Sequence, residues 1–154
     1  MRGLCLAGSL LLAATAWVAP PAQAQGSRTD VINTDQGVNG RHLRDAIALG
    51  RTALASLEGP QAAEELAGTH KTIDLMYRTV RLALFGMRER KKASKFDDPM
   101  LDYELGRTGK AWDIIRRPVD SYFNSLPPQV YIDNAIRDLQ EAIQILQPVA
   151  ALME

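Results

Sequence analysis

The two histidines of this chain, His42 and His70, are its main candidates for acid–base catalysis or metal binding. His70 is followed four residues later by Asp74, so the two side chains share one face if the segment is a helix. An imidazole oriented by a carboxylate is the arrangement of a general base. Because no serine or other nucleophile stands beside the pair in a recognisable motif, we expect a histidine satisfied by Asp74 and no catalytic residue. The alternative hypothesis is an enzyme that uses both side chains.

Metal and haem ligands must lie at one level of a fold, and the spacing of the candidates argues against this. Counting about 1.5 Å of helix rise per residue away from a turn at Gly59 places His42 and His70 about 10–15 Å apart along the axis. The same count places Met153 about 10 Å beyond His42. No glutamate precedes either histidine by three positions, as a di-iron bundle requires. We therefore predict no metal ligand and no cofactor; a non-covalent haem or metal in the core is the alternative.

A run of cations near the middle of the chain is its strongest charge cluster. It lies at the carboxyl end of a predicted helix, where each cation complements the helix dipole by about 0.3–1 kcal/mol. Asp97 and Asp98 follow at once and neutralise part of it. We interpret the cluster as a solvated helix end, and the alternative is a patch for an acidic partner, a polyanion or a membrane surface. The cluster comprises Arg88, Arg90, Lys91, Lys92 and Lys95.

Pro118 stands inside "AWDIIRRPVDSYF", a segment that otherwise has the apolar spacing of a helix. Its apolar residues recur at helical spacing on both sides of the proline, so we expect a helix that continues through it with a bend. Counted from the following turn, Pro118 should lie at the level of His70. Because these residues share one level of the bundle, we predict a small polar pocket there, lined by His70, Asp74, Arg116 and Arg117. The predicted apolar stripe comprises Trp112, Ile115, Val119 and Tyr122.

Four segments with helical periodicity must position these side chains. The first runs from Asn39 to a Gly59-Pro60 turn, the second over about 61–93, and the third from Pro99, with Asp97 or Asp98 as N-cap. A turn over 124–128 leads to the fourth. Four near-heptad stripes joined by short turns predict an all-α fold, an antiparallel up-down-up-down four-helix bundle over 39–154. The stripe of the fourth segment is the most regular: Ile132, Ile136, Leu139, Ile143, Leu146, Ala150 and Met153.

The first 24 residues predict a secretory signal peptide. One arginine precedes an apolar run from about Leu4 to Val18, and "AQA" up to Ala24 has the small-x-small pattern of a cleavage site. The run is shorter than the roughly 20 residues of a membrane span, although an uncleaved anchor is the alternative. We expect cleavage after Ala24, a polar tail over 25–38, and a periplasmic or secreted protein. Cys5 is the only cysteine, so the mature chain has no disulfide and no thiolate site.

The net charge and the predicted helix lengths limit the classes of function that this chain can have. Without Arg2, 17 of the 18 basic residues remain against 18 acidic ones, so no overall charge favours nucleic acid. The second predicted helix exceeds the first by roughly a dozen residues, so its basic end should project past Asn39 and offer a docking flank. We predict a non-enzymatic protein that binds another protein, as an accessory subunit, a sensor or a chaperone-like module. The alternative is a carrier of a small ligand, haem or metal in the bundle core, and the pattern assigns no oligomeric state.

Overall fold

Four helices make up the part of the chain that the structure, a computed structural model, describes, which is residues 28–153. They are α1 (Arg28–Leu57), α2 (Leu66–Ala93), α3 (Pro99–Ser121) and α4 (Pro128–Leu152). These residues contain no strand, so the predicted all-helical fold is confirmed. The predicted signal peptide and its cleavage site lie outside the described residues. Of the four helices, none has a stretch long and apolar enough to cross a lipid bilayer.

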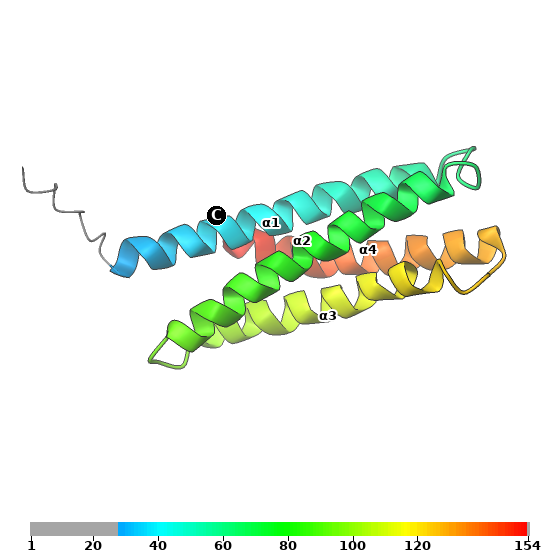
Figure 1. Ribbon diagram of the computed structural model, residues 1–154. Coiled ribbons are helices and arrows are strands. Elements are labelled where there is room, and N and C mark those ends of the chain that lie inside the picture. Colours follow the sequence, from blue (N-terminus) through cyan, green and yellow to red (C-terminus); the bar gives the residue numbers. More distant parts are fainter. Residues whose placement is uncertain (1–27, 154) are drawn as a thin grey trace, which may run out of the picture.

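The helices pack side by side around a shared core (Figure 1). The turn between α1 and α2 lies at one end of the molecule, the turn between α2 and α3 at the other, and the turn between α3 and α4 near the first end again. The contacting pairs are α1 with α2, α2 with α3, α3 with α4, and α4 with α1. Each helix therefore buries one face against two neighbours. The largest fully buried apolar side chains are Leu43, Ile73, Met76, Met87, Leu101, Ile114, Ile115, Leu139, Leu146, Val80 and Val149.

The predicted stripes hold on α1, α2 and α4 and shift on α3. On α4, only Ile136 of the predicted stripe is half-buried, and the other six residues are buried. On α3, only Ile115 of the predicted stripe is buried, and Trp112, Val119 and Tyr122 are half-buried. The face that α3 buries is instead centred about one residue away and includes a carboxylate and the proline. That face comprises Leu101, Glu104, Thr108, Ala111, Ile114, Ile115 and Pro118.

The helix ends differ from the sequence-based expectation in two places. α1 begins at Arg28, so residues 28–38 of the polar tail predicted over 25–38 are helical, because backbone hydrogen bonds propagate a helix beyond its buried stripe. α2 begins at Leu66, not near residue 61, because residues 58–65 form successive turns. The hydroxyls of Ser56 and Thr69 lie 2.6 Å apart and hydrogen bond across this junction. The predicted cap of α3 is confirmed: Asp98 Oδ1 accepts hydrogen bonds from the next two free backbone amides, at 3.1 Å each.

Two glycines let α1 approach its neighbours closely. A Cβ on Gly40 would lie 2.7 Å from the backbone oxygen and 2.8 Å from the Cβ of Met153, at the end of α4. A Cβ on Gly86 of α2 would lie 2.1 Å from Oδ1 of Asn39, which is 2% exposed. Side chains at these glycines would push α1 away from both helices. The two contacts therefore fix the level of α1 in the bundle.

Replacing Gly40 should cost stability, although alanine is the better helix former. We expect Gly40→Ala to lower the free energy of unfolding by about 1–3 kcal/mol, because the backbone of Met153 must move. Gly106→Ala is the matched control, since no heavy atom lies within 4 Å of its added Cβ; it should raise that free energy by about 0.4–1 kcal/mol. Urea unfolding followed by circular dichroism measures both. Equal effects of the two substitutions would contradict the close approach.

Candidate binding groove

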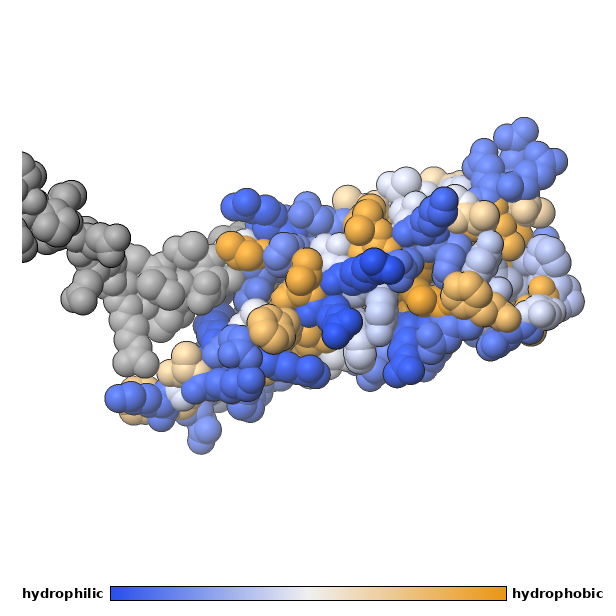
Figure 2. All heavy atoms as spheres, viewed as in Figure 1, coloured by the Kyte–Doolittle hydropathy of each residue, from blue (hydrophilic) through white to orange (hydrophobic). Residues whose placement is uncertain are grey.

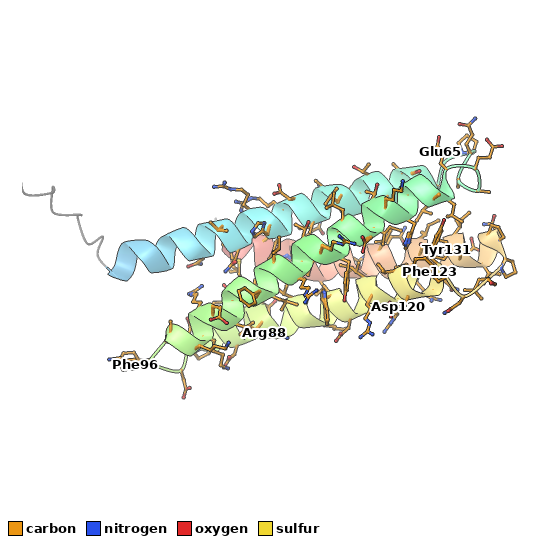
Figure 3. All side chains as sticks on the ribbon, viewed as in Figure 1. Glu65, Arg88, Phe96, Asp120, Phe123 and Tyr131 are labelled. Atoms are coloured by element: carbon orange, nitrogen blue, oxygen red, sulfur yellow. The ribbon has the colours of Figure 1, made fainter. Side chains whose placement is uncertain are left out.

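His70 lies among aromatic rings and is only 9% exposed. Its ring stacks on Tyr122 with 3.9 Å between centroids and 8° between planes, and the edge of Phe123 meets it at 5.5 Å. Tyr131 packs edge-on against Tyr122 at 5.7 Å, and Figure 3 shows Phe123 and Tyr131 near the same end of the molecule. The aromatic partners of His70 thus follow the end of α3, and Tyr131 at the start of α4 extends the cluster through Tyr122. His70 is a packing residue of this aromatic cluster.

Burial governs the ionisation of this cluster. Desolvation lowers the pKa of His70, and the negative charge of Asp74 partly offsets that effect. Burial also raises the pKa of Tyr131 to about 12, with a smaller contribution from Tyr122. Nδ1 of His70 is buried and has no hydrogen-bond partner among the described residues. The neutral imidazole is therefore the form that the folded protein favours.

The four residues of the predicted polar pocket do not form one site, because they contact different partners. Asp74 pairs with Arg78 at 2.7 Å, so its carboxylate is engaged on α2, although it remains near enough to act on His70. Arg116 pairs with Asp120 at 2.9 Å. The arginine beside it, Arg117, has its nearest carboxylate at 3.7 Å, on Asp138 of α4. α3 stays helical through the buried Pro118. The structure brings only His70 and Asp74 together.

Acid should unfold the protein partly through His70. A histidine whose folded pKa is lowered contributes stability above its unfolded pKa of 6.5, and this contribution is lost as the pH falls through the folded pKa. His70→Phe keeps an aromatic ring against Tyr122 but cannot titrate. We expect the free energy of unfolding of the wild type to fall relative to His70→Phe as the pH drops below about 6.5. Parallel pH profiles of the two proteins would show that burial does not act on His70.

Three of the five cations of the predicted anion patch at the end of α2 are paired with carboxylates. Arg90 lies 3.4 Å from Asp98 and 3.7 Å from Glu104. The two lysines that follow are also paired, Lys91 with Asp102 and Lys92 with Glu89. The pairs of Arg90 and Lys91 form because the short link to α3 brings the acidic start of that helix against the basic end of α2, whereas Lys92 pairs within α2. Of the five cations, Arg88 lines a separate hollow, described below, and Lys95 is exposed at the link.

Glu104 is a buried carboxylate that the sequence analysis missed. It is 1% exposed on the core face of α3, three residues after Leu101 and four before Thr108. Burial raises its pKa, the charge of Arg90 partly lowers it, and Asp98 raises it again. Its spacing from Leu101 and Thr108 was the available signal. Local periodicity alone places a carboxylate on the solvent side of a helix. The cation that pairs with Glu104 is Arg90, which lies on a different helix.

Glu104 should make the protein less stable as the pH rises. An acid whose folded pKa is raised stabilises the fold below its unfolded value of 4.5, and that stability is lost as the pH climbs to the folded value. Glu104→Gln has the same shape and cannot ionise. We expect the free energy of unfolding of the wild type to fall relative to Glu104→Gln above about pH 4.5. A wild type that gains stability relative to this variant over the same range would show that Arg90 outweighs burial.

A hollow of about 430 Å³ lies between α2 and α3, and we call it the α2/α3 groove. Its floor holds Tyr77 stacked on Trp112, with ring centroids 5.2 Å apart and planes 16° apart. Leu84 is buried beside them, and Phe85 is 64% exposed. Figure 2 shows apolar and strongly hydrophilic side chains interleaved on this face of the molecule. The lining residues are Tyr77, Arg81, Leu84, Phe85 and Arg88 of α2 and Trp112 and Arg116 of α3.

The cations of the α2/α3 groove differ in how far they are neutralised. Arg116 is held by Asp120 on its own helix. Arg81 and Arg88 are exposed, and neither has an ion-pair partner among the residues that the structure describes. Figure 3 labels Arg88 and Asp120 on the two helices that form the groove. The groove therefore combines an aromatic floor with two uncompensated positive charges.

Sequence reasoning missed the α2/α3 groove because it assigned Trp112 to the core. The one-residue displacement of the buried face of α3 moves this ring to the edge of the helix, where it meets Tyr77. A usable signal existed on α2, where Arg81, Phe85 and Arg88 stand at positions i, i+4 and i+7 on one helix face. That spacing places a large apolar side chain between two cations.

Another hollow, of about 500 Å³, lies between the start of α3 and the end of α4. It is lined by uncharged residues, of which Met100 is 51% and Leu152 is 44% exposed. No charged side chain lines it, so it has no electrostatic means of choosing a partner. We therefore take the α2/α3 groove as the candidate site.

The possible metal and haem ligands His42, His70 and Met153 belong to different parts of the bundle, α1, α2 and the end of α4. Among residues 28–153, no three His, Cys, Asp or Glu side chains gather as a metal site would need. Met153 packs against Gly40, two residues from His42, so the predicted separation of about 10 Å along the axis was too large. The count assumed that neighbouring helix ends lie level, whereas the linking turns offset them.

Comparison of the chain with protein-family models, with curated proteins and with solved structures found no match.

Proposed function

We propose that this protein is a non-catalytic binding protein that takes a protein partner in the α2/α3 groove. The signal peptide, cleaved after Ala24, delivers it to the periplasm or the cell exterior. There an antiparallel up-down-up-down bundle over 39–154 presents the groove, as an accessory subunit, a sensor or a chaperone-like module. The observation that carries this proposal is a half-buried aromatic floor beside the exposed ring of Phe85, flanked by the unpaired arginines Arg81 and Arg88.

The composition of the α2/α3 groove supports a protein partner. Tryptophan, tyrosine and arginine are the side chains that most often dominate binding energy at protein interfaces. Here Trp112, Tyr77 and Arg81 lie in one hollow, with Phe85 beside them. Leaving a phenylalanine ring 64% exposed keeps apolar area in water that a partner can cover, at about 25 cal/mol per Å². The surface is therefore suited to association.

The openness of the groove to solvent favours a partner over a small ligand. Pockets for small molecules enclose most of the ligand surface. The α2/α3 groove has a wall on each of two helices, and the phenylalanine of its lining, Phe85, is 64% exposed. The buried ionisable groups His70 and Glu104 do not line it, so they supply no acid or base to a bound molecule. Binding is the chemistry that these side chains support.

The proposal is tested by a photo-crosslinking side chain placed at Phe85 in the native host. We expect a covalent adduct with a partner protein from Phe85, because that side chain stands over the groove floor. Leu82 is the matched control: it is 56% exposed on the same helix but does not line the groove, so it should give no such adduct. The double substitution Arg81→Glu/Arg88→Glu should remove the adduct. Mass spectrometry identifies the crosslinked product.

No adduct at Phe85, or the same adduct from Leu82, would contradict binding in the α2/α3 groove. Circular dichroism of each variant controls for folding. Both crosslinker positions are exposed, and both arginines are exposed, so substitution there should leave the helix content unchanged.

A further inference from the structure

We propose that the occupant of the α2/α3 groove is an acidic segment of a partner protein, in which one apolar side chain is flanked by carboxylates about 10 Å apart. This inference rests on the proposed function and adds the chemistry of the partner. It follows from three observations: the charge of the lining residues, their spacing and the nature of the floor.

The charge of the lining residues is of one sign. Three arginines and no carboxylate line the α2/α3 groove, and Asp120 neutralises only Arg116. The guanidinium groups of Arg81 and Arg88 are therefore available to a carboxylate, which arginine binds through two parallel hydrogen bonds. An incoming acidic group would meet no competing anion within the lining. A basic or neutral segment would leave both cations without a partner.

The spacing of the cations sets the spacing of the anions. Arg81 and Arg88 stand seven residues apart on α2, which is about 10 Å along the axis. Phe85 lies between them, one turn from each. A matching segment thus places its apolar side chain at Phe85 and a carboxylate on either side. On a partner helix, the two carboxylates would stand two turns apart, on the same face as the apolar residue.

The floor explains why a discrete peptide segment is favoured over a membrane surface. Tyr77 and Trp112 present stacked rings in a concave hollow, which accepts an inserted side chain. An anionic membrane instead attracts a broad basic face. Around the groove the charges alternate: Asp74 pairs with Arg78 and Glu89 pairs with Lys92, while Asp113 follows Trp112. The unpaired arginines of the groove are therefore bordered by paired and opposite charges, not by a broad basic face.

The test is selection of binders from a library of random peptides displayed on phage, with the purified protein as the target. We expect enriched peptides to carry an apolar or aromatic residue flanked by glutamate or aspartate. The affinity of a synthetic consensus peptide, measured by fluorescence anisotropy, should fall about tenfold or more in Arg81→Glu/Arg88→Glu. Phe85→Ala, which changes no charge and removes a side chain that is 64% exposed, should also weaken binding.

The chain offers a matched control for charge. Arg44 and Arg51 are exposed on α1 and stand seven residues apart, as Arg81 and Arg88 do on α2. Arg44→Glu/Arg51→Glu makes the same change of net charge without touching the groove, so its affinity for the peptide should match that of the wild type. An equal loss in this control would attribute binding to net charge and overturn the inference.

Three other results would also overturn it. They are enrichment of basic or uncharged peptides, absence of any enriched peptide, and flotation with vesicles of anionic phospholipid that depends on Arg81 and Arg88. If Phe85 forms a specific crosslink in cells with a segment that lacks carboxylates, the proposed function stands and only the acidic class of the partner is rejected. If the selected acidic peptides bind but no adduct forms in cells, the groove chemistry stands and the proposed function is rejected.

Discussion

The junction between α2 and α3 is the constraint on which the rest of the site depends. Asp98 caps α3, an interaction of typically about 1 kcal/mol, and the same side chain pairs with Arg90 at the end of α2. Arg90 also reaches Glu104, and Lys91 reaches Asp102. These contacts fix how far along α2 the third helix begins. They thereby decide which residues of α3 meet Tyr77.

The level set at this junction produces the α2/α3 groove. With Glu104 drawn inward, the core face of α3 passes through Thr108, Ala111 and Ile115, which leaves Trp112 at the edge. There its ring stacks on Tyr77, and both rings line the same hollow as Arg81 and Arg88 of α2 and Arg116 of α3. The groove is thus a consequence of burying one charged residue. The junction also uses Arg90 and Lys91, so part of the predicted basic cluster is structural.

Sequence patterns could predict the helices but not the face of α3. The stripes of α1, α2 and α4 and the cap at Asp98 depend on residues near in sequence, and the structure confirms them. The burial of Glu104 depends on Arg90, fourteen positions away on another helix, so local periodicity placed the carboxylate outside and Trp112 inside. The same limit applies to His70. Its local partner Asp74 was found, but its stacking on Tyr122 required the relative level of two helices.

The central claim is that Arg81 and Arg88 concentrate anions at the aromatic floor, and Trp112 can report on this directly. The chain has two tryptophans, so in Trp17→Phe the fluorescence comes from Trp112 alone. Collisional quenching by iodide, compared with neutral acrylamide, measures the local concentration of anions. The account predicts that adding Arg81→Gln/Arg88→Gln weakens quenching by iodide and leaves quenching by acrylamide unchanged. Equal quenching by iodide with and without the two arginines would contradict it.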